Sequence, residues 1–208
     1  MVQLRGGAEA AELEDRKLIL SAAGGDRAAF TELVRRRRPL VHRLAARICG
    51  PEEAEDVTQV VFLRLWRELP RLVRTGHFER WLARVTVNRA IDALRHIARR
   101  LRMLARRRQE SPRPPLEESL QRGEVSRVFF AVAEELGDRQ RAAFVLRELE
   151  GYETREVAAI LGVTASTVRN LVHQARRGLR RALRDRFPEY APREESDEIG
   201  TEGTSATV

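Results

Sequence analysis

The 208-residue chain has little of what several classes of protein require. Cys49 is the only cysteine, which excludes an internal disulfide and a cysteine-rich metal site. His42 lies seven residues before Cys49, but two candidate ligands make a poor zinc site, so we expect a half-buried thiol and no metal or other cofactor. No apolar run approaches the ~18 residues of a membrane span, and the N-terminus lacks a signal-peptide core. We therefore expect a cytoplasmic protein without membrane insertion.

Patterns typical of catalysis are missing too. The sequence has no glycine-rich phosphate loop, no zinc-ligand cluster and no Ser-His-Asp arrangement in a suitable context. Aromatic residues make up only 5% of the chain, strand-favouring Tyr and Thr are scarce, and the apolar residues are mostly Leu, Val and Ala. These features predict an all-α protein that is not an enzyme.

What the chain does have is positive charge. The formal net charge is +8, and from Pro188 onward six acidic residues and one Arg carry −5, which leaves +13 on the rest. A body this basic indicates a polyanionic partner, with nucleic acid the first candidate. All of the 39 basic residues except Lys17 are Arg, which we attribute mainly to the codon bias of a GC-rich genome.

Helical periodicity in the first half of the chain predicts four helices, over about 14–23, 26–50, 52–69 and 77–108. Asp26 is a good N-cap for the second of these helices. Pro39 lies inside the same helix and should kink it or split it in two. Residues 70–76 begin with a proline and end with a glycine, and we predict a loop there.

Three prolines between residues 112 and 115 predict a flexible linker with extended stretches. Four more helices are predicted beyond it, over about 119–136, 138–149, 154–161 and 165–186. The acidic segment after Phe187 is predicted to be disordered. The predicted architecture is two small helical domains, with an N-terminal extension and short helix over 1–25, a first domain over 26–108, a linker over 109–124, a second domain over 125–187 and a tail over 188–208.

Residues 154–186 have the mechanics of a helix-turn-helix. Three residues of its first helix are expected to pack inward, namely Val157, Ala158 and Leu161. Gly162 provides a left-handed turn, and Thr164 caps the second helix. Outward and flanking positions of the second helix carry hydroxyl, amide, imidazole and guanidinium groups that can read base edges: Ser166, Thr167, Arg169, Asn170, His173, Gln174, Arg176 and Arg177. The motif predicts DNA binding without identifying the class of DNA-binding protein.

Two motifs in the first domain narrow that class. One reads Asp56-Val-Thr-Gln-Val-Val-Phe-Leu-Arg-Leu-Trp66, and the other places six residues at fixed spacings along a basic helix, namely Phe78, Trp81, Leu82, Asn88, Asp92 and Arg95. In this order, ahead of a helix-turn-helix, they resemble bacterial RNA polymerase sigma factors of the extracytoplasmic-function (ECF) group of the sigma-70 family. The resemblance covers about residues 26–100 and 125–186.

The resemblance implies a promoter-specificity subunit that binds core RNA polymerase, recognises the −35 and −10 promoter elements and helps to open the DNA. In the family, the helix that corresponds to 52–69 docks on the β′ clamp helices, and the polymerase partners also include the β flap. The residues carried over for docking are Asp56, Gln59 and Arg64. Val60 departs from the acidic residue that is common in the family, which leaves it half-exposed or at an interface.

By the same resemblance, the helix over 77–108 holds the non-template strand of the −10 element through Arg80, Arg84, Asn88 and Arg95. The loop predicted to begin at Pro70 would form a pocket for an extruded base. Phe78 and Trp81 can stack on bases, although an aromatic pair three residues apart on a helix more often belongs to a core.

The outward residues of the helix-turn-helix are implied to recognise the −35 element. Leu171 and Gln174 replace arginines that are common there in the family, which predicts a weaker grip on phosphate. A further implied partner is an anti-sigma protein that occludes both domains.

Two other hypotheses remain open from the sequence. A stand-alone regulator would bind a two-fold symmetric duplex site by itself and use its first domain for dimerisation or sensing. A nucleic-acid enzyme with an invertase-like C-terminal domain would need a nucleophilic Ser or an acidic metal cluster, and the N-terminal half offers neither convincingly.

Overall fold

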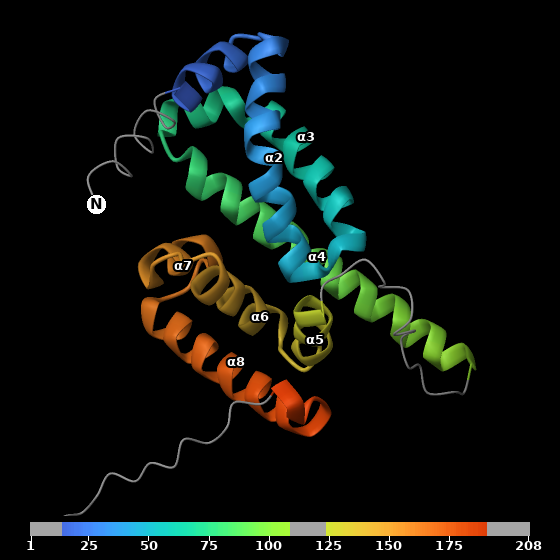
Figure 1. Ribbon diagram of the computed structural model, residues 1–208. Coiled ribbons are helices and arrows are strands. Elements are labelled where there is room, and N and C mark those ends of the chain that lie inside the picture. Colours follow the sequence, from blue (N-terminus) through green and yellow to red (C-terminus); the bar gives the residue numbers. More distant parts are fainter. Residues whose placement is uncertain (1–13, 109–123, 191–208) are drawn as a thin grey trace, which may run out of the picture.

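The computed structural model describes residues 14–108 and 124–190, and every regular element in these two ranges is a helix, as predicted (Figure 1). The N-terminal half consists of a helix over 14–23, α2 (Arg27–Cys49), α3 (Pro51–Thr75) and α4 (Phe78–Arg108). The C-terminal half consists of α5 (Glu124–Ala133), α6 (Asp138–Phe144), a π-helix η1 (Val145–Leu149), α7 (Thr154–Leu161), α8 (Ala165–Arg186) and a short 3-10 helix η2 (Pro188–Tyr190). Most of the predicted linker and acidic tail lies outside the described residues.

Helix α2 begins where its capping residue predicts. The carboxylate of Asp26 accepts hydrogen bonds from the backbone N–H groups of Ala28, at 2.8 Å, and Ala29, at 3.1 Å. The helix then continues through Pro39 to Cys49, so of the two predicted outcomes, a kink or a split, the split does not occur. An interior proline costs about 3 kcal/mol. Buried apolar residues on both sides of it, Leu33 and Val41, supply packing that offsets this cost.

Helix α3 also runs through a proline, and the predicted loop over 70–76 is wrong. Leu69 and Leu72 flank Pro70 and are both buried in the same helical stripe, so packing again outweighs the lost hydrogen bond. The helix ends only at Gly76, whose φ of 66° is left-handed and whose N–H donates to the carbonyl of Leu72 at 3.0 Å. Two residues therefore separate α3 from α4.

The C-terminal half differs from its prediction at two helix ends and in one additional turn of helix. The helix predicted over 138–149 changes at Val145 from α to π geometry, with the Glu150 N–H donating to the carbonyl of Val145 at 3.0 Å. Helix α5 ends at Ala133 instead of Leu136. Residues 188–190, predicted to be disordered, form the single turn η2. Helices α7 and α8 have the predicted limits.

The two halves pack against each other and share one hydrophobic core. Helices α6 and α7 lie along α4, whereas α8 lies on the side of the C-terminal half that is away from the N-terminal half (Figure 1). The shared core joins the buried residues of α2, α3 and α4 to a set from the C-terminal half, namely Ala142, Ala143, Val145, Leu146, Val157, Ala158, Ile160, Val168 and Val172. A second, smaller core lies between α5 and α8. The structure is therefore a closed arrangement of the two halves.

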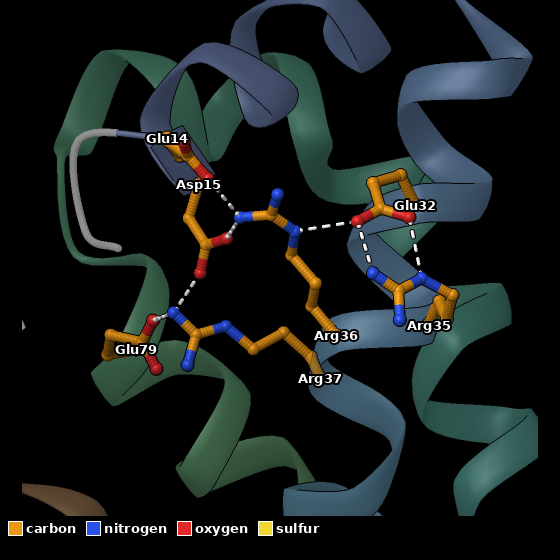
Figure 2. Close-up of polar contacts among 7 residues, drawn as sticks. All are labelled: Glu14, Asp15, Glu32, Arg35, Arg36, Arg37 and Glu79. Carbon is orange, nitrogen blue, oxygen red and sulfur yellow. Dashed lines mark hydrogen bonds and ion pairs between the residues drawn. The ribbon is translucent and has the colours of Figure 1, made fainter. Parts of the chain in front are cut away.

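Ion pairs among a group of charged residues connect the 14–23 helix to the rest of the N-terminal half (Figure 2). Asp15 is only 5% exposed and pairs with Arg37, which also reaches Glu79 of α4 at 2.5 Å. Arg36 pairs with Glu14 at 2.8 Å and with Glu32 at 2.8 Å. These contacts connect the 14–23 helix, α2 and the start of α4.

Candidate nucleic-acid interface

The helix-turn-helix forms with the predicted turn and cap. Gly162 has φ 66°, and the hydroxyl of Thr164 accepts a hydrogen bond from the N–H of Thr167 at 3.1 Å. One inward residue differs from the prediction, because Ile160 is 1% exposed while Leu161 is only partly buried. The inward stripe of α8 is buried as its spacing predicts, and consists of Val168, Val172, Ala175, Leu179 and Ala182.

Helix α8 presents an exposed polar face. It lies on the outer side of the C-terminal half, so the N-terminal half does not cover it (Figure 1). Four side chains on this face are exposed and form no side-chain hydrogen bond or ion pair with another described residue: Arg169, Asn170, His173 and Arg177. Guanidinium, amide and imidazole groups in this position are available to base edges and phosphates in a major groove.

The remaining predicted −35 residues have partners within the protein. The amide oxygen of Gln174 accepts a hydrogen bond from Gln140 of α6 at 2.9 Å. Arg176 pairs with Glu148 of η1 at 2.7 Å. Thr167 and Ser166 both lie at 2.8 Å from the hydroxyl of the capping Thr164. In this structure, fewer of the predicted −35 residues are therefore free to contact DNA than the sequence indicates.

The predicted −10 residues share one side of α4, because successive members are four, four and seven residues apart: Arg80, Arg84, Asn88 and Arg95. This side faces the C-terminal half. Arg80 lines a cavity of about 690 Å³ together with Tyr152 and Glu156. Arg84 reaches the turn of the helix-turn-helix, since a Cβ added to Gly162 would lie 3.8 Å from its Nη2.

The same side of α4 continues into a second cleft between the halves. Asn88 and Arg95 line this cleft, which has a volume of about 350 Å³, together with Arg139 of α6 and Leu161 of α7. Arg95 also pairs with Asp138 of α6 at 2.8 Å. All four predicted −10 residues thus lie beside the C-terminal half, and all four side chains are still exposed in the closed arrangement.

A buried carboxylate in the C-terminal half ties the two halves together. The side chain of Glu150, which follows η1, is only 4% exposed. It accepts hydrogen bonds from Arg47 at 2.7 Å and from Arg43 at 3.1 Å, both on α2, and Arg47 also donates to the carbonyl of Leu149 at 2.8 Å. Hydrogen bonding to Glu150 raises the pKa of Arg43. Sequence reasoning missed this contact, because its members are more than a hundred residues apart and no local pattern marks them.

The predicted polymerase-binding residues lie on more than one face of α3. Asp56 and Gln59 are exposed, whereas Arg64 lies about 140° from Gln59 around the helix and lines the cleft between the halves. Val60 is 40% exposed and Leu63 is 64% exposed, so an apolar strip lies beside Gln59. Trp66 packs edge-on against Phe30, with ring centroids 4.8 Å apart. The helix therefore separates Arg64 from Gln59, and Asp56 lies between them, about 60° from Gln59 and about 80° from Arg64.

The pocket predicted for an extruded base requires correction. Its proposed wall, a loop starting at Pro70, is helical, and only Gly76 and His77 connect α3 to α4. These two residues line the 690 Å³ cavity. Phe78 is buried in the core and Trp81 packs partly against it, as expected for an aromatic pair with this spacing.

No three His, Cys, Asp or Glu side chains between 14 and 108 or between 124 and 190 are grouped so that they could hold a metal ion. None of the helices in those ranges is both long and apolar enough to span a membrane. Cys49 is 6% exposed, so it is buried and not half-buried, and burial raises the pKa of its thiol to about 12.

Comparison with known proteins gives the same family for both halves. The family model for sigma-70 region 2 matches residues 33–101, and that for sigma-70 region 4 matches residues 129–179. The chain is 37% identical over 179 residues to the ECF RNA polymerase sigma factor SigE of Mycolicibacterium smegmatis, covering 81% of this chain and 68% of that protein. It is 31% identical to the ECF sigma factor SigM of Mycobacterium tuberculosis, covering 83% of this chain and 86% of SigM.

Two solved structures have a similar fold. One is the structure of CnrH in complex with the cytosolic domain of CnrY, with a TM-score of 0.60 and 26% identity over 83% of this chain and 99% of the other. The other is the sigma factor RpoE in complex with the anti-sigma factor NepR from Bartonella quintana, with a TM-score of 0.52 and 20% identity over 74% of this chain and 96% of the other. The second likeness is one of fold alone.

Proposed function

The chain belongs to the extracytoplasmic-function sigma factors of the sigma-70 family and is a promoter-recognising subunit of RNA polymerase, and we propose how its surfaces divide that work. The outer face of α8 reads the −35 element through Arg169, Asn170, His173 and Arg177. The basic side of α4 holds the non-template strand of the −10 element. The protein acts in the cytoplasm without an active site of its own, by binding DNA and core polymerase.

The observation that carries this proposal is the pairing of a free helix-turn-helix face with a second basic face on α4. A stand-alone regulator needs only the first of these. Four aligned polar side chains on α4, three of them arginines, suit a single strand whose backbone must be held after the duplex opens. The C-terminal half lies beside the α4 face in the closed arrangement and limits the space for a strand, so we propose that the halves separate before the −10 strand binds.

Polymerase docking is assigned to the exposed face of α3 around Gln59. Asp56 and Gln59 offer acid and amide groups there, and Val60 and Leu63 add exposed apolar surface that a partner helix can bury. Glu55 on the same helix is already engaged, since its hydrogen bond with Arg38 at 2.7 Å lowers its pKa. Arg64 is exposed but lines the cleft between the halves, and we propose that it contacts the polymerase in the open form.

An anti-sigma partner is also proposed. Two similar structures are complexes, one of CnrH with the cytosolic domain of CnrY and one of the sigma factor RpoE with the anti-sigma factor NepR. A partner that prefers the closed arrangement would keep the C-terminal half beside the α4 face and so hold the protein inactive.

Run-off transcription tests the proposed function. Purified bacterial core polymerase is assayed with and without this protein on a promoter library from the same genome. We expect new transcripts from discrete start sites that depend on the protein. Tight binding to a duplex by the protein alone, with no protein-dependent initiation, would instead support a stand-alone regulator.

Two variants then separate the assigned surfaces. Gln59→Ala should weaken competition for core polymerase while leaving binding to a −35 duplex unchanged. Arg71→Ala, an exposed position on another face of α3, is the matched control. A Gln59 variant that competes for core polymerase as well as the parent would overturn the docking assignment.

A further inference from the structure

The cleft between the two halves is lined mainly by positive charge. Its volume is about 350 Å³, and four guanidinium groups from three helices surround it: Arg64 of α3, Arg89 and Arg95 of α4, and Arg139 of α6. Asn88 adds an amide, and Asp92 is the one carboxylate in the lining. The lining thus has a formal charge of +3.

Few counter-ions are available to these arginines in the described part of the chain. Arg95 pairs with Asp138 at 2.8 Å, but Arg64, Arg89 and Arg139 have no ion pair with any other described residue. Like charges brought together in this way repel one another unless an anion lies between them. Guanidinium groups are suited to phosphate, because their planar forks bind its oxygens in pairs.

Because the cleft lies between the two halves, binding of a ligand there depends on how the halves are arranged. Arg64, Arg89 and Arg95 come from the N-terminal half, and Arg139 comes from the C-terminal half. A ligand that touches both sides is bound fully only when the halves are closed, so it stabilises the closed arrangement by mass action.

We propose that this cleft binds a small oligophosphate, either inorganic or the phosphate chain of a nucleotide, and that the bound anion holds the halves closed. The binding step is independent of promoter recognition. Its consequence, weaker capture of the −10 strand, rests on the function proposed above. Arg89 and Arg139 belong to none of the surfaces assigned to DNA or polymerase, so they can be changed without altering those surfaces.

Calorimetry of the full chain tests the binding step, with inorganic tripolyphosphate as the probe at fixed ionic strength. Arg139→Ala removes the one guanidinium that the C-terminal half contributes to the cleft. Binding of tripolyphosphate should weaken about tenfold or more, the effect of losing a charge-assisted contact. Arg155→Ala is the matched control, because Arg139 and Arg155 are both exposed and both occupy the second position of a helix. Thermal unfolding shows whether each variant is folded.

Three results would overturn the proposal. The first is no binding of tripolyphosphate by the parent. The second is an equal loss in Arg139→Ala and Arg155→Ala, which indicates general attraction to a basic protein. The third is a loss of DNA binding but not tripolyphosphate binding in Arg89→Ala and Arg139→Ala, which would assign the cleft to the DNA backbone.

Two further arms complete the test. Comparing tripolyphosphate with a nucleoside triphosphate distinguishes the two sources of the phosphate chain, since a tighter nucleotide means that the base or sugar also contacts the cleft. Tripolyphosphate should weaken binding of the −10 strand to the parent severalfold and have less effect on Arg139→Ala. Calorimetry needs neither promoter nor polymerase, so failure of the proposed function leaves its result intact.

Discussion

The two surfaces proposed to bind DNA differ in how they are presented. The polar face of α8 lies on the outside of the C-terminal half, and four of its side chains have no partner among the described residues. The polar side of α4 faces the C-terminal half, so its side chains, although exposed, lie beside α6, α7 and the turn at Gly162. The C-terminal half therefore carries the proposed −35 surface on one side and restricts the space beside the proposed −10 surface on the other. In the closed form, we expect the protein to recognise duplex DNA before it can hold a single strand.

The contacts that close the halves differ in strength. Arg95 and Asp138 are partly exposed, and a pair of this kind contributes about 1 kcal/mol or less. Glu150 is buried beneath Arg43 and Arg47, and removing one partner of a buried pair is more costly. The apolar contacts of Ile160 and its neighbours in the shared core add to these. Glu150 is thus the polar residue that most directly links closure to the rest of the fold.

The largest effect should come from breaking the core that the halves share. Ile160→Ala should lower the free energy of unfolding by about 2–5 kcal/mol, because the side chain is fully buried between α7 and the N-terminal half. Leu161→Ala, at the adjacent and partly exposed position, should cost less than half as much. Urea denaturation followed by circular dichroism measures both. Equal losses would mean that the inward face of α7 has been misassigned.

A smaller effect, on DNA affinity, should distinguish α8 residues that have no partner within the protein from those that already pair. Arg169→Ala should weaken binding to a −35 duplex by about 1–3 kcal/mol, the range for a side chain that contacts bases. Arg176→Ala should have a smaller effect, because Arg176 already pairs with Glu148. Fluorescence anisotropy with a duplex chosen from mapped start sites gives both affinities. A larger loss for Arg176 would place the reading face on the other side of α8.

Alkylation of Cys49, the only cysteine, can report how tightly the two halves pack together. Burial raises the pKa of the Cys49 thiol to about 12, so the parent should react slowly with iodoacetamide at pH 8. Cys49 lies at the end of α2, close enough to Arg141 of α6 for the guanidinium to influence its thiol. Glu150→Ala should therefore speed alkylation severalfold by loosening the halves. An unchanged rate would show that the N-terminal half alone buries the thiol.

The smallest expected effect is on stability at low pH and comes from Glu32 in the N-terminal half. Hydrogen bonds from Arg35 and Arg36 lower the pKa of Glu32 from 4.5 to about 2. A carboxylate with a lowered pKa contributes stability above its ordinary pKa, and that contribution is lost as the pH falls toward about 2. Glu32→Gln should therefore change the slope of stability against pH between those two values and leave it unchanged near neutrality. Thermal unfolding as a function of pH measures this slope.

Local signals in the sequence predicted the helix-turn-helix well. Gly162, Thr164 and the apolar spacing of α8 each act within a few residues, so they can be interpreted without knowing the fold. The prolines at 39 and 70 misled the prediction, because tertiary packing on both sides outweighs a local preference for breaking a helix. The roles of the residues proposed to contact DNA and polymerase remain predictions from the sequence.

The relation between the halves could not be predicted from the sequence. Glu150 with Arg43 and Arg47, and Asp138 with Arg95, join positions far apart in the chain, where no spacing rule applies. The family motif groups Arg64 with Gln59 along the sequence, but the helix turns them apart. Domain limits at 26–108 and 125–187 remain a prediction, and the shared core shows that two sequence segments need not fold as two separate bodies.

The most direct test of this account compares both DNA-binding faces in the parent and in Glu150→Ala. Binding of a −10 non-template strand and of a −35 duplex is measured for each protein by anisotropy at one salt concentration. We predict that Glu150→Ala binds the single strand severalfold more tightly than the parent and binds the duplex equally well. Equal single-strand affinities for the two proteins would contradict the claim that the C-terminal half restricts access to the −10 surface.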